Sequence, residues 1–285
     1  EPRSRGPCRL RVAMEVQWDD RTTFTVYNVV NTAVTFWGIN ALMYLCYHFD
    51  LFSDCKIQPA RWPTKKLVYE TMMGNFVSAF VLNPVISWYL LYPMFRSLGM
   101  TFGPDTMPSP FIALAQLVFY FMVSDMTFYW LHRLFHWGPL YRNVHKKHHD
   151  YKVPVGVAAS YAHPVEEICV NFSTVLWGTI IWPCHLNVWL AWMFIRIWES
   201  VDGHSGYNFP WSPWIYIRGE TDFHDYHHSK NVGKYAVNSI PLVITSQLRH
   251  FCVELGSLDG HRQVIPNIPR QTQESVKVHF HFQKK

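Results

Sequence analysis

Long stretches without formal charge dominate the first half of this chain. Residues 24–47 and 72–95 contain no Asp, Glu, Lys or Arg, and residues 111–131 contain only Asp125. A helix of about 20 apolar residues crosses the hydrocarbon core of a membrane. Each stretch is therefore a candidate membrane-spanning helix. Pro84 is expected to kink the second one or to split it into a re-entrant pair.

The composition favours a membrane protein over a large soluble core. Hydrophobic residues make up 49% of the 285 residues, and charged residues only 16%, against roughly 25% in soluble domains. The net charge of +5 is mild, and beside such apolar stretches it suits a membrane surface better than nucleic acid. The six cysteines are scattered without a C-x-x-C pair, so they indicate neither a disulfide framework nor a zinc ribbon.

A fourth apolar stretch, residues 168–195, is interrupted by Pro183. We interpret it as two helices, at about 168–182 and 187–200, that dip into the bilayer as a hairpin and return to the side of entry. The expected fold is an all-α integral membrane bundle of three or four spans plus this re-entrant hairpin. The expected domains are a polar N-terminal segment (1–23), a membrane domain (24–236) and a loosely ordered tail (237–285).

Histidines recur at helical spacing in the second half of the chain. They form one His-x-x-x-His pattern and two His-x-x-His-His patterns: His132 and His136; His145, His148 and His149; His224, His227 and His228. Positions i, i+3 and i+4 share one face of a helix, so each cluster should direct its imidazoles to a common point. Neutral imidazole binds iron, zinc, copper and nickel well. We therefore expect these eight histidines to be metal ligands and catalytic residues.

His163 and His204 extend the expected ligand set to ten, whereas His185, beside Pro183, is excluded as a packing residue. Ten imidazoles are too many for one tetrahedral zinc and suit two metals. Zinc with three protein ligands and a water would support hydrolysis, and two irons would support O2 activation. Spacing alone does not separate these possibilities. The membrane setting favours oxidation of a lipid C–H bond, because apolar substrates lie in the bilayer.

Carboxylates flank the histidines, Glu166 and Glu167 among them, and each could accept a hydrogen bond from the far nitrogen of a ligating imidazole. Surface ion pairing is the alternative for any one of them. Asp125 lies on the helix face of His132 and His136. A carboxylate inside an apolar helix is costly without a partner, so Asp125 is expected to accept from a metal-bound imidazole. The alternative is that it snorkels to the membrane surface near the helix end. The expected outer shell is Asp125, Tyr129, Glu199, Asp202 and Asp225.

The distribution of basic residues predicts a topology. The connection 48–71 holds four Lys or Arg, whereas 96–110 holds only Arg96. The positive-inside rule places the first in the cytosol and the second in the lumen. The histidine-box region, 125–236, then forms a cytosolic di-metal helical cap. The Arg-rich N-terminus would be lumenal; either that is so, or the segment with Pro84 does not cross fully.

The motifs HRLFH, HKKHH, SYAHPVEE, DGHSGYNFPWS and HDYHHSKNVGKYA, in this order, resemble the fatty acid hydroxylase superfamily. The sterol branch, with C-4 methylsterol monooxygenases and cholesterol 25-hydroxylases, is the most similar. The resemblance is strong over about residues 110–236 and rests on hydropathy over 24–109. After residue 236, VNSIPLVITSQLRHF stands where such sequences usually have an aromatic-rich segment with Trp-Asp and Phe-Gly-Thr.

The resemblance implies a multi-pass protein of the endoplasmic reticulum membrane with two Fe ions, which zinc could replace in recombinant protein. It carries the ligand roles over to the ten histidines above. It also implies O2 as co-substrate and electrons from cytochrome b5 and an NAD(P)H reductase. The expected activity is oxidation of a sterol or related lipid, most like C-4 methylsterol oxidation. Alternatives are another hydroxylase or desaturase of the superfamily, a catalytically inactive splice form, and a non-enzymatic metal-binding membrane protein.

Overall fold

The structure is a computed structural model that describes residues 19–59, 61–212 and 221–231. The described residues belong to the first of two compact units, residues 1–243. The predicted tail and most of the predicted N-terminal segment lie outside the described residues. The described part is helical and, apart from two isolated backbone bridges, contains no strand. The all-α prediction is confirmed.

Three helices of the described part are long and apolar enough to cross a membrane: Asp20–His48, Lys65–Ser97 and Pro110–Phe135. The first is α1. The second contains α2 (Lys65–Val77), α3 (Asn83–Ile86) and α4 (Tyr92–Ser97), and the third is α5. Each begins at a side-chain cap, in which Asp19, Thr64 or Ser109 accepts a hydrogen bond from a backbone N–H of the first turn.

Pro84 does not split the second span. Two wide, π-helical turns, η2 (Ser78–Leu82) and η3 (Ser87–Leu91), lie on either side of α3, which contains Pro84. Proline removes one backbone hydrogen bond from a helix, and a wide turn redistributes the remaining bonds without ending the helix. The helix therefore continues from Lys65 to Ser97, and of the two expected alternatives, a kink or a split into a re-entrant pair, the split is wrong.

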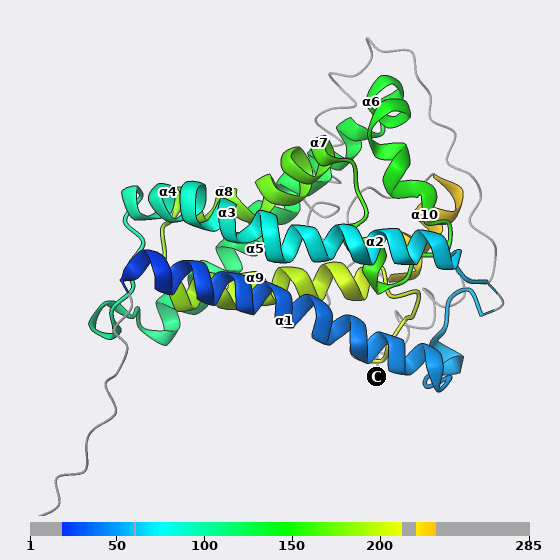
Figure 1. Cartoon of the computed structure of the whole chain (residues 1–285), viewed down its shortest axis with the longest axis horizontal. Coiled ribbons are helices and arrows are strands. Elements are labelled where there is room, and N and C mark those ends of the chain that lie inside the picture. The colour runs from blue at the N-terminus through cyan, green and yellow to red at the C-terminus, as the bar shows by residue number, and fades with distance from the viewer. Residues whose placement is uncertain (1–18, 60, 213–220, 232–285) are drawn as a thin grey trace, which may run out of the picture. The chain divides into compact units, whose positions relative to one another are not determined.

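The fourth apolar stretch forms the predicted hairpin. Its first arm contains α7 (Pro164–Glu166), η7 (Glu167–Phe172) and α8 (Ser173–Ile181), and its second arm is α9 (Leu186–Gly203). α8 packs on α5, and α9 lies beside α1 (Figure 1). Gln116 and Tyr120 of α5 donate hydrogen bonds to the carbonyls of the hairpin turn, at Pro183 (3.0 Å) and Trp182 (2.6 Å). These bonds satisfy carbonyls that the end of a helix leaves without intrahelical partners.

One end of the bundle holds the start of α1, the 97–110 connection and the hairpin turn. Arg96 lies 3.7 Å from Asp20, and the imidazole of His185 contacts the carbonyl of Gly103 at 3.2 Å. The connection contains η4 (Pro104–Thr106). The histidine clusters lie at the opposite ends of α5 and α9, where His132 is in the last turn of α5 and His204 caps the end of α9.

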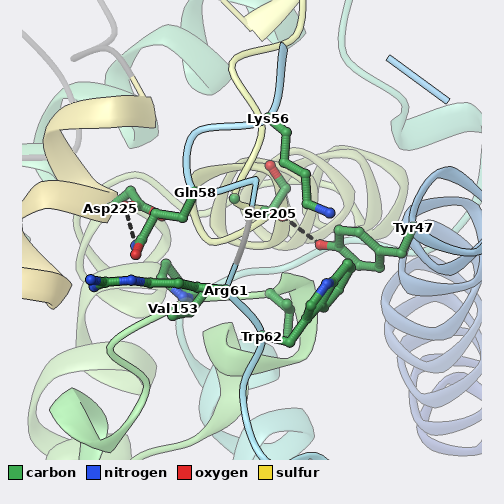
Figure 2. Close-up of a pocket in the computed structure, with 11 residues that line it drawn as sticks. Tyr47, Lys56, Gln58, Arg61, Trp62, Val153, Ser205 and Asp225 are labelled. Atoms are coloured by element: carbon green, nitrogen blue, oxygen red, sulfur yellow. Dashed lines mark hydrogen bonds between the residues drawn. The ribbon is translucent and has the colours of Figure 1, made fainter. Parts of the chain in front are cut away.

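The other end, called the histidine end below, holds the connection 49–64 and the short helices. These are η1 (Ser53–Cys55), α6 (Gly138–Asn143), η5 (His145–Asp150), η6 (Gly156–Ser160) and α10 (Thr221–Lys230). Figure 2 shows the connection 49–64 against the segment that follows α9. Ile57 N donates to the Gly206 carbonyl at 2.9 Å, and Asn208 N donates to the Cys55 carbonyl at 2.8 Å.

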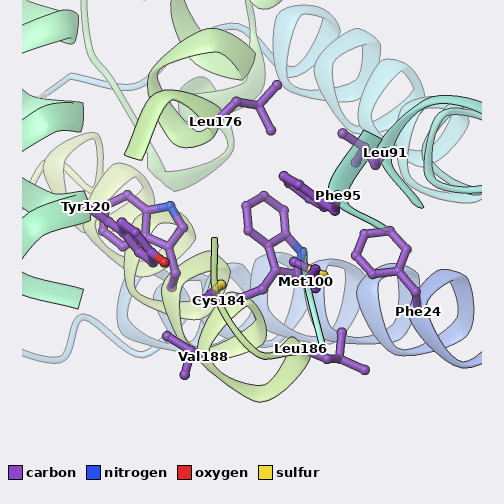
Figure 3. Close-up of a cluster of buried hydrophobic side chains, with 11 residues drawn as sticks. Phe24, Leu91, Phe95, Met100, Tyr120, Leu176, Cys184, Leu186 and Val188 are labelled. Atoms are coloured by element: carbon purple, nitrogen blue, oxygen red, sulfur yellow. The ribbon is translucent and has the colours of Figure 1, made fainter. Parts of the chain in front are cut away.

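The largest apolar core joins α1, α4, α5, α8 and α9 (Figure 3). Phe95 packs at its centre, with ring centroids 5.9 Å from Phe24 and 4.7 Å from Trp189. A polar contact crosses the same helices: Asn28 donates to Ser87 at 3.0 Å and accepts from the Trp189 indole at 2.9 Å. Because polar groups inside a membrane bundle need partners, these bonds tie α1 to the second span and to α9.

Candidate metal centre

Nine of the ten predicted ligands gather into two groups at the histidine end. The first group is His132, His136, His145, His149 and His227, and the second is His148, His204, His224 and His228. Within each group the ligand nitrogens all lie within 4.8 Å of one another. Segments separated by up to 95 residues therefore meet in one place.

Each His-x-x-His-His motif is divided between the two groups. In η5, His145 and His149 belong to the first group, and His148 belongs to the second; in α10, His224 and His228 belong to the second group, and His227 belongs to the first. The expectation of one common centre is therefore wrong for these two motifs, whereas His132 and His136 of the His-x-x-x-His pattern both belong to the first group. Residues at i and i+4 share a face, whereas the residue at i+3 is turned enough to reach the neighbouring group.

The Nε2 atoms within each group are spaced like ligands of one metal. His145 Nε2 lies 3.1 Å from that of His132 and 3.0 Å from those of His136 and His149. In the second group, His204 Nε2 lies 2.9 Å from that of His224 and 3.3 Å from that of His148. Nitrogens bound to one metal at about 2.1 Å lie about 3.0–3.4 Å apart.

Backbone carbonyls fix the tautomer of three rings in the second group. Nδ1 of His148, His204 and His228 lies 2.9, 2.7 and 3.1 Å from the carbonyls of residues 161, 200 and 151. A carbonyl only accepts, so each Nδ1 carries the proton and each Nε2 presents a lone pair. Burial lowers the pKa of His148 and places that of His228 well below its usual value. Because converging lone pairs repel unless a cation lies between them, the donor set fits a metal ion.

A carboxylate takes the corresponding place in the first group. His145 Nδ1 donates to Glu166 Oε1 at 2.5 Å, and neither side chain is more than 5% exposed. Burial raises the pKa of Glu166 to about 8, so a cation bound at the first group would be needed to keep this carboxylate ionised near pH 7. An ionised acceptor would orient the ligating ring and raise its basicity. Burial also lowers the pKa of His136 to about 4, which keeps this ring neutral near pH 7.

The residues expected in the outer shell have varied surroundings. Asp125 is buried in α5, and Tyr129 accepts a bond from Arg133 at 3.4 Å. Glu199 forms an ion pair with Arg196 of the same helix. Asp202 accepts from Ser212 at 3.2 Å, and Asp225 accepts from Gln58 at 2.6 Å. Glu166, which contacts His145, was among the flanking carboxylates but not in the narrower outer-shell list, and Gln58, which contacts Asp225, was not expected at all.

Three histidines of the described residues lie in neither group: His48, His163 and His185. His163 precedes α7, and its Nδ1 accepts a bond from Val165 N at 3.2 Å, so it caps this helix. The structure thus does not bring this predicted ligand to either group. His185 caps α9 through Asn187 N at 3.1 Å, and it lies at the opposite end of the bundle.

Comparison with known proteins identifies relatives over most of the chain. The fatty acid hydroxylase family matches residues 117–243. A very-long-chain aldehyde decarbonylase of Oryza sativa subsp. indica is 35% identical over 234 residues, 76% of this chain and 83% of the relative. A methylsterol monooxygenase of Aspergillus fumigatus is 32% identical over 217 residues, 74% of this chain and 73% of the relative. A methylsterol monooxygenase of Arabidopsis thaliana is 43% identical over 139 residues, 48% of this chain and 52% of the relative. No solved structure matches the chain.

Proposed function

The chain belongs to the fatty acid hydroxylase family, and we propose that it is a membrane di-iron monooxygenase that oxidises a C–H bond of a sterol or related lipid. The observation that carries this proposal is the pair of all-histidine groups at one end of three candidate membrane spans. The relatives named as methylsterol monooxygenases make a 4-methylsterol the first substrate to test.

Two irons would be held by nine histidines. The first iron would bind the group of His145, and the second would bind the group of His204, as defined above. Bound iron would supply the activation of O2, with electrons from an external donor. Nitrogen-rich sites also bind zinc well, so recombinant protein could carry zinc instead.

The chain's own residues would orient the ligands and admit the substrate. The carbonyls behind His148, His204 and His228, and the carboxylate of Glu166 behind His145, hold each ring with Nε2 toward its group. His132 lies in the last turn of α5. The centre therefore lies where this span leaves its apolar stretch, and a lipid could present one carbon there while its apolar body stays in the bilayer.

A second candidate is oxidative chemistry on a long-chain aldehyde. It is favoured by the aldehyde decarbonylase relative, of which the match covers 83%. The same two histidine groups would serve either substrate, so the geometry of the ligands does not separate the two activities. Analysis of the reaction products separates them.

We further propose that the protein lies in the endoplasmic reticulum membrane with its histidine end facing the cytosol. Cytochrome b5 and an NAD(P)H reductase would be the electron donors. The connection 49–64, with Lys56 and Arg61, lies at this end, next to the basic η5 segment with Lys146 and Lys147. The 96–110 connection at the other end contains only Arg96. The positive-inside rule then favours this orientation, with α1 entering from the lumen.

The test combines metal analysis with product analysis. Full-length protein produced in iron-supplemented cells should contain about two irons per chain, as the two groups require. Microsomes containing the protein should then be supplied with 4-methylsterol, with long-chain aldehyde and with 18O2. Incorporation of 18O into the sterol supports the proposal, and consumption of the aldehyde alone supports the second candidate. One metal or none in intact protein refutes the dinuclear centre.

A further inference from the structure

The second histidine group depends on three segments that are distant in sequence. His148 comes from η5, His204 follows α9, and His224 and His228 come from α10. Ligands on separate segments must be held in fixed relative positions for a metal to bind well, and their supporting contacts decide how well this is done. One connection, residues 49–64, contacts all three segments.

The connection pairs directly with the chain that follows His204. Ile57 N donates to the carbonyl of Gly206, and the carbonyl of Cys55 accepts from Asn208 N, in a short antiparallel bridge. Tyr47, at the end of α1, donates its hydroxyl hydrogen bond to the carbonyl of Ser205, which adjoins His204. The segment behind this ligand is thereby fixed to the connection through its backbone.

Gln58 links the connection to the two remaining segments through one side chain, and Figure 2 shows its bond to Asp225. Its Nε2 donates to Oδ1 of Asp225 at 2.6 Å and to the carbonyl of Lys152 at 3.1 Å. Asp225 is 2% exposed and lies between His224 and His228 on α10. Lys152 is two residues beyond the end of η5. A primary amide has two N–H donors, and this one uses both to hold α10 against the exit of η5.

We propose that Gln58 is a positioning residue for the second metal, fixing α10 relative to η5 so that His224 and His228 meet His148. This inference rests on the proposed function, since it takes the second group to be a metal site. The side chain contacts no histidine in any of its hydrogen bonds, so its effect passes through Asp225 and the backbone. Removing it leaves the nine histidines in place and changes only how the second group is held.

Glutamate is the most specific replacement, because it has the same shape as glutamine and changes only the hydrogen bonding and the charge. An ionised Glu carries no donor, so in this form Gln58→Glu removes both hydrogen bonds. It also sets a carboxylate against the carboxylate of Asp225, which opposes the close approach seen here. The double variant Gln58→Glu with Asp225→Asn exchanges the donor and the acceptor. It restores one hydrogen bond between the same two positions without the like-charge contact.

Lys56→Ala is the matched control from the same connection. The ammonium group of Lys56 lies 3.9 Å from the ring centroid of Trp62, which belongs to the same connection. Its loss removes this cation–π contact at a partly exposed site. If the connection mattered only as a general support for the fold, this variant and Gln58→Glu would both lower thermal stability, and neither would reduce iron retention at one site more than at the other.

The experiment measures 57Fe content and Mössbauer spectra of the full-length protein in lipid nanodiscs, with circular dichroism to follow helix content. Wild-type protein and Lys56→Ala should hold about two irons per chain. Gln58→Glu should lose about 10–100-fold in iron retention at one site, as expected for loss of an outer-shell partner. Its spectrum should lose one iron component and keep the other, and the double variant should recover much of the lost component.

Each outcome separates this inference from the proposed function. Two irons and an unchanged spectrum in Gln58→Glu overturn the positioning role, and so does equal loss of both irons or of helix content. Wild-type protein that holds two metals but oxidises no lipid overturns the proposed function and leaves this test intact. Wild-type protein with no metal in the second group overturns both.

Discussion

Replacing Glu166 by alanine is expected to weaken the first metal site selectively. Its carboxylate accepts the His145 Nδ1–H at 2.5 Å, and the two side chains are 5% and 1% exposed. Alanine would leave this N–H buried without its acceptor. His145 Nε2 lies 3.0–3.1 Å from the Nε2 atoms of three other rings. Reorientation of this one ring therefore disturbs most of the first group.

Two independent estimates give the size of the effect. A buried donor left without a partner costs about 1–3 kcal/mol. Loss of an outer-shell partner lowers metal affinity or activity by about 10–100-fold, which is about 1.4–2.7 kcal/mol. The estimates agree, so Glu166→Ala should weaken iron retention at the first site by this factor. Glu166→Gln keeps a neutral acceptor, which is about half as strong as a charged one, so a loss of about 3–10-fold is expected.

The neighbouring carboxylate supplies the control. Glu167 accepts a bond from Asn171 at 2.8 Å, within the same helix and away from the histidines. Glu167→Gln should change iron retention by no more than about twofold, as for most substitutions outside a key contact. The assay is the rate of iron transfer from purified protein to a competing chelator, with Mössbauer spectra to identify the iron component that is lost.

The ranking of the variants decides the result. Iron retention should fall in the order Glu167→Gln, Glu166→Gln, Glu166→Ala. If Glu166→Ala and Glu167→Gln retain iron equally, the carboxylate does not support His145 and the argument is refuted. Loss of the second iron before the first would equally contradict it, because the contacts of Glu166 described here lead to the first group.

Three further outcomes are expected. Gly178→Ala should lower the thermal unfolding temperature in detergent, because the new Cβ would lie 2.9 Å from a backbone atom of α5. Such overpacking costs about 1–3 kcal/mol. Gly74→Ala should not lower this temperature, because its Cβ would meet nothing within 4 Å. His148→Ala should abolish turnover and release one iron, whereas His185→Ala should keep both by elemental analysis, since this ring caps α9 at the other end. Removal of residues 244–285, beyond the family match, should leave the iron content near two per chain.

The spans and the histidine pairs could be predicted because each depends on spacing along one helix. An uncharged stretch of sufficient length predicts a membrane helix, and imidazoles at i and i+4 share a face whatever surrounds them. His145 and His149 therefore met as expected. The assignment of His148 to the other group could not be predicted, because it depends on how η5, α9 and α10 pack together.

The supporting contacts were harder to predict for the same reason. Glu166 is 21 residues from His145, and Gln58 is 167 residues from Asp225. Contacts over such separations result from tertiary packing, and no local pattern marks them. Closeness in sequence favoured Glu199 instead, because it lies near His204. The ion pair described for this carboxylate is with Arg196, which lies one helical turn away.

The wide turns around α3 have a consequence for how the second span tolerates changes in length. Asn83 and Ser87, which bond to Asn28 of α1, follow the wide turn at Ser78–Leu82. Each residue advances an α-helix by about 100°. A π-helical turn holds about one residue more than a regular turn, so deleting one residue from it would let it close to α geometry with the following polar side chains still facing α1. Single-residue deletions in this turn should therefore be less damaging than deletions in a regular turn of the same span, where one lost residue would rotate the polar side chains that follow it by about 100°.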